Sequence, residues 1–198
     1  MEGKNPKRKR KRLLMLPLLA LVVVGIWVVT AVVGRRAPAP VDPRGMSPPM
    51  AAMARDFNVL RLDHSNRCSL TAGEVMGMAS SARLRGSCCQ AMDFRHYAVQ
   101  RRGLGGYQSL EVVPADPYDV PVSLAKRLLR VGGRIDLTDE QQRTYDHAVS
   151  LSHEHGPCCC QCWRWDVFEA QAKVLIAERG IASEDIARIW NLEDGCGG

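Results

Sequence analysis

The stretch that decides the fold runs from residue 156 to 180 and reads GPCCCQCWRWDVFEAQAKVLIAERG. Its first part holds four of the chain's eight cysteines within five positions. Its second part repeats apolar residues at helical spacing up to a glycine, which predicts a helix over residues 163–179. Adjacent thiols add little to packing, and the chemistry of a cysteine usually matters more, so we expect function at this cluster.

The rest of the chain outside the N-terminal region also favours helices. Ser69, Pro121 and Ser183 are suited to helix starts, and Thr138 with Gln141 forms a capping box. These signals predict helices over residues 69–84, 91–102, 121–131, 138–153 and 183–190. Strand-like alternation is confined to residues 109–113. The predicted fold class is therefore mainly α, a small cysteine-rich helical domain.

The charge of the chain is concentrated at its N-terminus. The formal net charge is +6 over 198 residues, and residues 1–12 alone contain seven basic residues and one acidic residue. The remaining chain is therefore neutral overall. This distribution argues against nucleic acid as a partner, because a binding domain would carry the basic excess itself.

Residues 13–34 read LLMLPLLALVVVGIWVVTAVVG and contain no charge. A bilayer span needs about 20 apolar residues, so this segment predicts one transmembrane helix. A cleavable signal peptide is the alternative, although its apolar core is usually shorter. The basic tail favours a cytoplasmic N-terminus and a C-terminal domain outside the cell membrane.

Four regions follow from this reading. They are a basic cytoplasmic tail (1–12), a transmembrane helix (13–34), a linker rich in Pro, Ala and Met (35–58) and a cysteine-rich helical extracytoplasmic domain (59–198). Membrane lipid is the expected partner of the first two. The linker is expected to be extended through about Met53. Its methionines at 46, 50 and 53 are either soft copper(I) ligands or part of a plain tether.

The cysteine cluster offers two geometries. In an extended chain Cys158, Cys160 and Cys162 project to one face, and Cys159 projects to the other. In a turn Cys159 and Cys162 form a Cys-x-x-Cys pair. Either geometry brings two or three sulfurs within reach of one metal ion. The candidate metal ligands are Cys158, Cys160, Cys162, Cys159, Cys196 and His155.

The residues after the cluster are expected to tune it. Trp163, Trp165 and Phe168 can pack over the thiols and exclude water. Arg164 can favour thiolates by its positive charge, or it is simply a solvated or ring-stacked cation.

A second thiol site is expected upstream. Cys89, Asp93 and His96 have the spacing of one helical face, and Cys68 and Cys88 can join them from outside the helix. The possible second site thus comprises Cys68, Cys88, Cys89 and His96. The alternative is a disulfide between Cys68 and one of the neighbouring pair.

These residues support a membrane-anchored extracytoplasmic protein that binds copper or zinc, with an Fe–S cluster as a further option. The alternatives are a thiol-disulfide redox protein and a disulfide-linked interaction module; eight cysteines allow 105 pairings. A metal-trafficking or redox protein is the expected partner. The sequence leaves open whether the protein is an enzyme.

The hexapeptide Pro157-Cys158-Cys159-Cys160-Gln161-Cys162 resembles the Pro-Cys-Tyr-Cys-x-Cys signature of the CYCxC family of membrane-anchored bacterial and archaeal proteins. The likeness covers roughly residues 136–192 and includes the segments 145–148 and 181–186. It implies an exported, tethered helical domain in which Cys158, Cys160 and Cys162 bind metal or perform redox chemistry. Cys159 replaces the family's tyrosine, and the family's later cysteine pair is absent.

Overall fold

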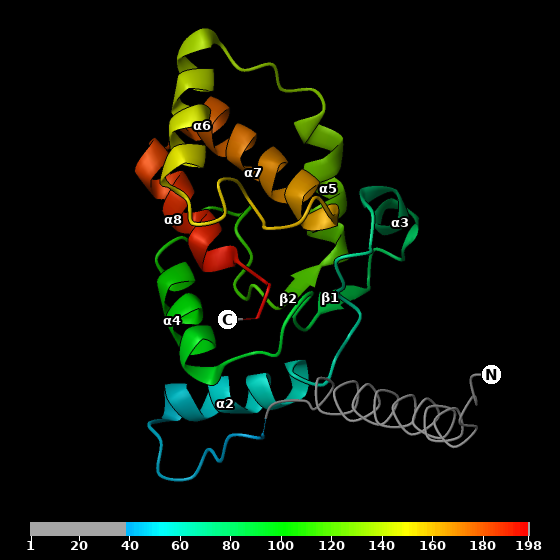
Figure 1. Ribbon diagram of the computed structural model, residues 1–198, viewed down its shortest axis with the longest axis vertical. Coiled ribbons are helices and arrows are strands. Elements are labelled where there is room, and N and C mark those ends of the chain that lie inside the picture. Colours follow the sequence, from blue (N-terminus) through cyan, green and yellow to red (C-terminus); the bar gives the residue numbers. More distant parts are fainter. Residues whose placement is uncertain (1–38, 198) are drawn as a thin grey trace, which may run out of the picture. The chain divides into compact units, whose positions relative to one another are not determined.

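The computed structural model describes residues 39–197, which form seven helices and one two-stranded sheet (Figure 1). The elements are α2 (Pro48–Leu60), α3 (Ala72–Gly77), β1 (Arg83–Arg85), α4 (Phe94–Gly105), β2 (Asp119–Pro121), α5 (Val122–Gly132), α6 (Asp139–Leu151), α7 (Trp163–Arg179) and α8 (Ser183–Glu193). The predicted mainly α class is confirmed.

The predicted membrane anchor, residues 13–34, and the basic tail before it lie outside the described residues. Within residues 39–197, each helix is too short or too polar to cross a bilayer. The anchor therefore stays a prediction from the sequence.

Helix α7 organises the core and has the bounds expected from its apolar spacing. The residues predicted to face inward are all buried, namely Val167, Phe168, Ala172, Leu175 and Ile176. Gly180 ends the helix in the left-handed conformation, with φ of 62°. Figure 1 shows α7 between α6 and α5, and it contacts both. The helix is thus the common packing partner of its neighbours.

The expected helix over residues 69–84 is wrong in length. Thr71, rather than Ser69, caps α3, and it forms a capping box with Glu74. The helix ends after Gly77, a poor helix former, and the next residue is already extended. The chain then enters β1, where Leu84 pairs with Val120 of β2 in an antiparallel register. Both side chains are fully buried, so tertiary burial overrides the helical pattern.

Two further stretches differ from expectation. Residues 109–113 form turns rather than a strand, with Val113 N donating to Leu110 O at 2.8 Å. The linker expected to be extended is helical from Pro48 onward, as α2. Prolines fit the first turn of a helix, and α2 buries Phe57 and Leu60 in a second small core with residues of α4.

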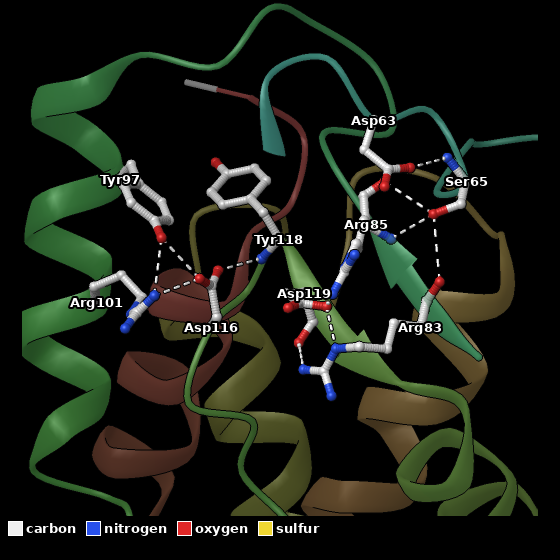
Figure 2. A network of polar contacts seen from close by, with 9 residues as sticks. All are labelled: Asp63, Ser65, Arg83, Arg85, Tyr97, Arg101, Asp116, Tyr118 and Asp119. Carbon is white, nitrogen blue, oxygen red and sulfur yellow. Dashed lines mark hydrogen bonds and ion pairs between the residues drawn. The ribbon is translucent and has the colours of Figure 1, made fainter. Parts of the chain in front are cut away.

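Figure 2 shows the polar contacts that hold the β1–β2 sheet to the loop before α3. Asp119 accepts hydrogen bonds from Arg83 Nε at 2.5 Å and Arg85 Nε at 3.1 Å. Ser65 Oγ accepts from the Arg85 amide at 2.8 Å and donates to the Arg83 carbonyl at 3.3 Å. These contacts fix the loop that carries Cys68 against the strand that leads to Cys88.

Asp116 joins the other side of this network to α4 (Figure 2). It accepts a hydrogen bond from Tyr97 Oη at 2.8 Å and forms an ion pair with Arg101 at 2.5 Å. It also accepts from the Tyr118 amide at 2.9 Å. The segment that enters β2 is therefore anchored to α4, and both elements border the C-terminal tail.

The α5–α7 contact gives a test of this packing. A Cβ atom at Gly132 would lie 2.2 Å from Ala170 Cβ, whereas one at the next residue, Gly133, would meet nothing within 4 Å. We expect Gly132→Ala to lower the free energy of unfolding by about 1–3 kcal/mol, because overpacking forces the helices apart.

The matched control is Gly133→Ala, which should be neutral or stabilising by up to about 1 kcal/mol. Chemical denaturation of both variants measures the difference. Equal stabilities would show that α5 and α7 do not pack at this glycine.

Candidate metal centre

All eight cysteines of the chain are free thiols, and four separate segments bring them together. Cys68 comes from the loop before α3, and residues 88–89 follow β1. Residues 158–162 precede α7, and Cys196 follows α8. The two thiol sites expected from the sequence are therefore one cluster.

The upstream cysteines meet the downstream ones through short sulfur–sulfur distances. Cys160 Sγ lies 3.6 Å from Cys68 Sγ and 3.8 Å from Cys89 Sγ. Cys89 Sγ in turn lies 3.5 Å from Cys88 Sγ and 3.7 Å from Cys196 Sγ. The thiols thus form a continuous chain of contacts across the cluster.

The remaining cysteines extend this chain. Cys159 Sγ lies 3.4 Å from Cys160 Sγ and 2.8 Å from Cys196 Sγ. The Cys158 thiol has hydrogen-bond contacts with Cys162 and Cys196. Cys159 is exposed, whereas Cys158, Cys162 and Cys196 are buried. One side of the cluster therefore faces solvent and the other faces the core.

Three groups of three sulfurs lie within 4.8 Å of one another, a spacing suited to a metal ion. We call these groups the triads; they are Cys68, Cys89 and Cys160, then Cys88, Cys89 and Cys196, and then Cys158, Cys159 and Cys196. Cys162 belongs to none of them. Within the described chain, no histidine or carboxylate joins a triad.

The C-terminal tail is held in place by the segment after β1. Backbone N–H groups of residues 88–93 donate to the three carbonyls of residues 195–197, with N···O distances of 3.0, 2.8 and 3.1 Å. Cys196, one of the candidate ligands from the sequence, is thereby brought back to the other cysteines. This pairing fixes Cys196 beside Cys88 and Cys89.

Of the two geometries considered for residues 158–162, the extended one does not occur, and the turn that forms does not group Cys159 with Cys162. The chain turns, and the Cys162 amide donates to the Cys160 carbonyl at 2.9 Å. As a result Cys158 and Cys160 lie in different triads, and Cys162 lies outside all three. His155 is exposed, adopts a positive φ of 51° and belongs to no triad.

The helical face expected for Cys89, Asp93 and His96 does not form either. Cys89 lies before α4, and Asp93 is the N-cap of that helix. Its carboxylate accepts a hydrogen bond from the His96 amide at 2.8 Å, which is the usual role of Asp at this position. His96 is exposed and outside the triads. Capping chemistry therefore explains the spacing that suggested a site.

A buried arginine lies beside the cluster. Arg164 is only 1% exposed and stacks against the rings of Trp163 and Phe168, with its Cζ 5.4 and 4.8 Å from their centroids. Its guanidinium donates to the Pro117 carbonyl at 3.0 Å and to the Glu193 carbonyl. Two of the aromatic residues expected to pack over the thiols, Trp163 and Phe168, thus enclose this cation and shield it from solvent.

The neighbouring thiols and the arginine favour negative charge at two thiols of the cluster, Cys88 and Cys158. Hydrogen bonds from Cys158 and Cys196 lower the pKa of Cys88, and the charge of Arg164 adds to this effect. Contacts with Cys162 and Cys196 lower the pKa of Cys158 to about 7. The cluster therefore carries thiolate at neutral pH, and thiolate is the form that binds metal.

Other thiols of the cluster behave differently, on both of its sides. Contacts with neighbouring thiols, together with burial, raise the pKa values of the buried Cys162 and Cys196. Burial against their neighbours raises the pKa of Cys68 and of Cys159 to about 12. These thiols stay protonated until a cation replaces the proton, so we expect metal binding to release protons.

Glu193, which was not among the candidate residues from the sequence, is fully buried beside Arg164. Its Oε1 accepts a hydrogen bond from Gln171 Nε2 at 2.6 Å, and its Oε2 has no hydrogen-bond partner. Burial raises the pKa of Glu193 to about 8, so the acid is neutral at neutral pH. Its position on the apolar face of α8, three residues after Trp190, was the only signal for burial.

This acid predicts a pH-dependent stability. The folded chain holds the Glu193 proton more tightly than the unfolded chain, whose pKa is near 4.5. The stabilising contribution is therefore complete below pH 4.5 and is lost as the pH rises through about 8. Over this pH range the unmodified chain should lose up to about 1.4 kcal/mol of unfolding free energy per pH unit through Glu193. The Glu193→Gln variant should not show this loss.

Chemical denaturation of the unmodified chain and of Glu193→Gln at several pH values measures the difference between their free energies of unfolding. The thiols titrate in both proteins, so their contribution cancels in this difference. Glu178→Gln, at an exposed position of α7, is the matched control and should follow the unmodified chain. Parallel stability curves for all three proteins would contradict a neutral Glu193.

Comparisons with protein-family models, with curated proteins and with solved structures find no match to this chain.

Proposed function

We propose that this protein binds a soft or borderline metal ion, copper or zinc, through its cysteine cluster. The observation that carries the proposal is the convergence of free thiols from four segments into the triads. Thiolate sulfur is the ligand that these ions prefer. An Fe–S centre would use the same sulfurs, but it would be vulnerable outside the cell.

The sulfur spacing supports this proposal. Two sulfurs that bind one ion at about 2.3 Å lie at most about 4.6 Å apart. The contacts of Cys160 with Cys68 and Cys89, at 3.6 and 3.8 Å, fall within this limit. The same holds for Cys196 with Cys88, at 3.7 Å. Little movement is needed for the side chains to close on an ion.

The proposed ligands are the seven cysteines of the triads. They include Cys158, Cys159, Cys160 and Cys196 from the sequence prediction, and they add the upstream cysteines. Cys162 and His155 are left out because neither lies in a triad.

We further propose that residues 13–34 anchor this domain outside the cell membrane, where a metal-trafficking or redox protein is its partner. The apolar segment, the basic tail and the resemblance to the CYCxC family support this placement. Reporter fusions to each end of the chain test it, and activity of a periplasm-specific reporter at the N-terminus would contradict it.

Metal analysis tests the binding function. We expect the full chain, purified without oxygen, to retain at least one equivalent of copper or zinc. Replacing Cys89, Cys160 and Cys196 by serine should lower the bound metal at least about tenfold, because each triad loses one or two ligands.

Cys162→Ser is the matched control. Cys162 is the N-cap of α7 and makes no side-chain capping bond, and serine suits that position. Metal retained by the triple variant at the level of this control would rule out the proposal.

A second candidate function is thiol-disulfide exchange, which one distance favours. Cys159 Sγ lies 2.8 Å from Cys196 Sγ, closer than any other sulfur pair with a stated distance here, and Cys159 is exposed. In this reaction the two thiols lose two protons and two electrons to a disulfide oxidant and form one S–S bond.

We expect one equivalent of diamide, added to the metal-free full chain, to form the Cys159–Cys196 disulfide first. Peptide mapping without reduction identifies the bond, and diamide is reduced to its hydrazine. A first disulfide between other cysteines, or random pairing, would count against this second function.

A further inference from the structure

The triads share corners. Cys89 belongs to the first and the second, and Cys196 belongs to the second and the third. Three separate sites of three sulfurs would need nine thiolates, but the triads contain seven different cysteines. If all three were filled at once, Cys89 and Cys196 would each have to bind two ions.

Such sharing is ordinary chemistry for copper(I) thiolates. A thiolate sulfur keeps lone pairs after binding one ion, so it can bridge two. Copper(I) is well satisfied by three thiolates, whereas structural zinc takes four ligands in a tetrahedron. Every group of close ligands in the described chain contains three sulfurs, and none contains four.

We infer that the cluster holds three copper(I) ions, one at each triad, with Cys89 and Cys196 as bridging thiolates. This inference rests on the proposed metal-binding function and names its metal and its stoichiometry. The remaining five cysteines of the triads each bind a single ion; they are Cys68, Cys88, Cys158, Cys159 and Cys160.

The surroundings of Cys196 support its role as a bridging ligand. Cys196 is only 7% exposed, and the backbone pairing of residues 195–197 with residues 88–93 fixes its position. Its Sγ has short contacts to Cys88, Cys89 and Cys159, so it stands at the centre of the sulfur network. A bridging ligand has to be central and well fixed in this way.

Exposure also differs within each triad. Each triad contains one exposed thiol, which is Cys89 in the first two and Cys159 in the third. Ions can therefore reach every triad from the solvent side, where a donor thiol can exchange with them. The opposite side is closed by buried sulfur and by the aromatic residues around Arg164.

The full chain, purified without oxygen, is titrated with copper(I) against a copper(I)-specific chelator. We expect three ions per chain to bind cooperatively. X-ray absorption at the copper edge should show three-sulfur coordination and a short copper–copper vector, which a bridging thiolate enforces. When zinc is added in place of copper, the same measurement at the zinc edge should show no metal–metal vector.

Single variants separate bridging from terminal ligands. Cys89→Ser removes a corner of two triads and should lower the capacity from three ions to one. Cys68→Ser removes a corner of one triad and should leave two ions. Cys162→Ser, outside the triads, should keep all three. Circular dichroism of each variant checks its fold.

The outcomes distinguish the three-copper cluster from the metal-binding function on which it rests. Tight binding of a single ion, or of several ions without a copper–copper vector, overturns the cluster and leaves the metal-binding function intact. Equal losses for Cys89→Ser and Cys68→Ser overturn the bridging role. A full chain that binds neither copper nor zinc overturns both. The absorption result on the unmodified chain holds even if a variant fails to fold.

Discussion

The pairing of the C-terminal tail with the segment after β1 is the constraint on which the cluster depends. Three backbone hydrogen bonds hold residues 195–197 against residues 88–93. Without them, Cys196 would be at the end of a free chain, and the second and third triads would each lose a corner. The tail can be placed there only because α8 packs on α4 and α6 and directs its end toward the sulfur atoms. The helical fold thus positions Cys196 in the cluster through a few backbone hydrogen bonds.

The same region contains a charge arrangement that opposes stability. Arg164 is buried, and its partners are carbonyl groups rather than an ionised carboxylate. Glu193 is next to it but is kept neutral by burial, with one oxygen lacking a hydrogen bond. A buried cation without a compensating anion is costly. Anionic thiolates nearby can offset this charge: hydrogen bonds from neighbouring cysteines lower the pKa of Cys88 and Cys158, and the charge of Arg164 adds to this effect.

Much of the fold could be predicted because local signals decide it. The capping box of Thr138, the apolar spacing of α7 and the stop at Gly180 are all as expected. Non-local burial was not visible in the sequence. Leu84 lies in a strand because its partner is Val120, a residue far along the chain. The expected extended linker is helical for the same reason, since Phe57 of α2 packs against Phe94 and Tyr97 of α4.

The candidate site shows the same division between local and non-local information. The sequence indicated thiol chemistry at residues 158–162 because cysteine density is a local property. It could not indicate that Cys68 and Cys160, separated by 92 positions, lie 3.6 Å apart. In an extended chain Cys158, Cys160 and Cys162 would share one face, yet the turn before α7 places Cys158 and Cys160 in different triads, each completed by distant segments. Metal binding would therefore join the loop before α3, the end of β1, the start of α7 and the tail, so the free energy of binding would also stabilise the fold.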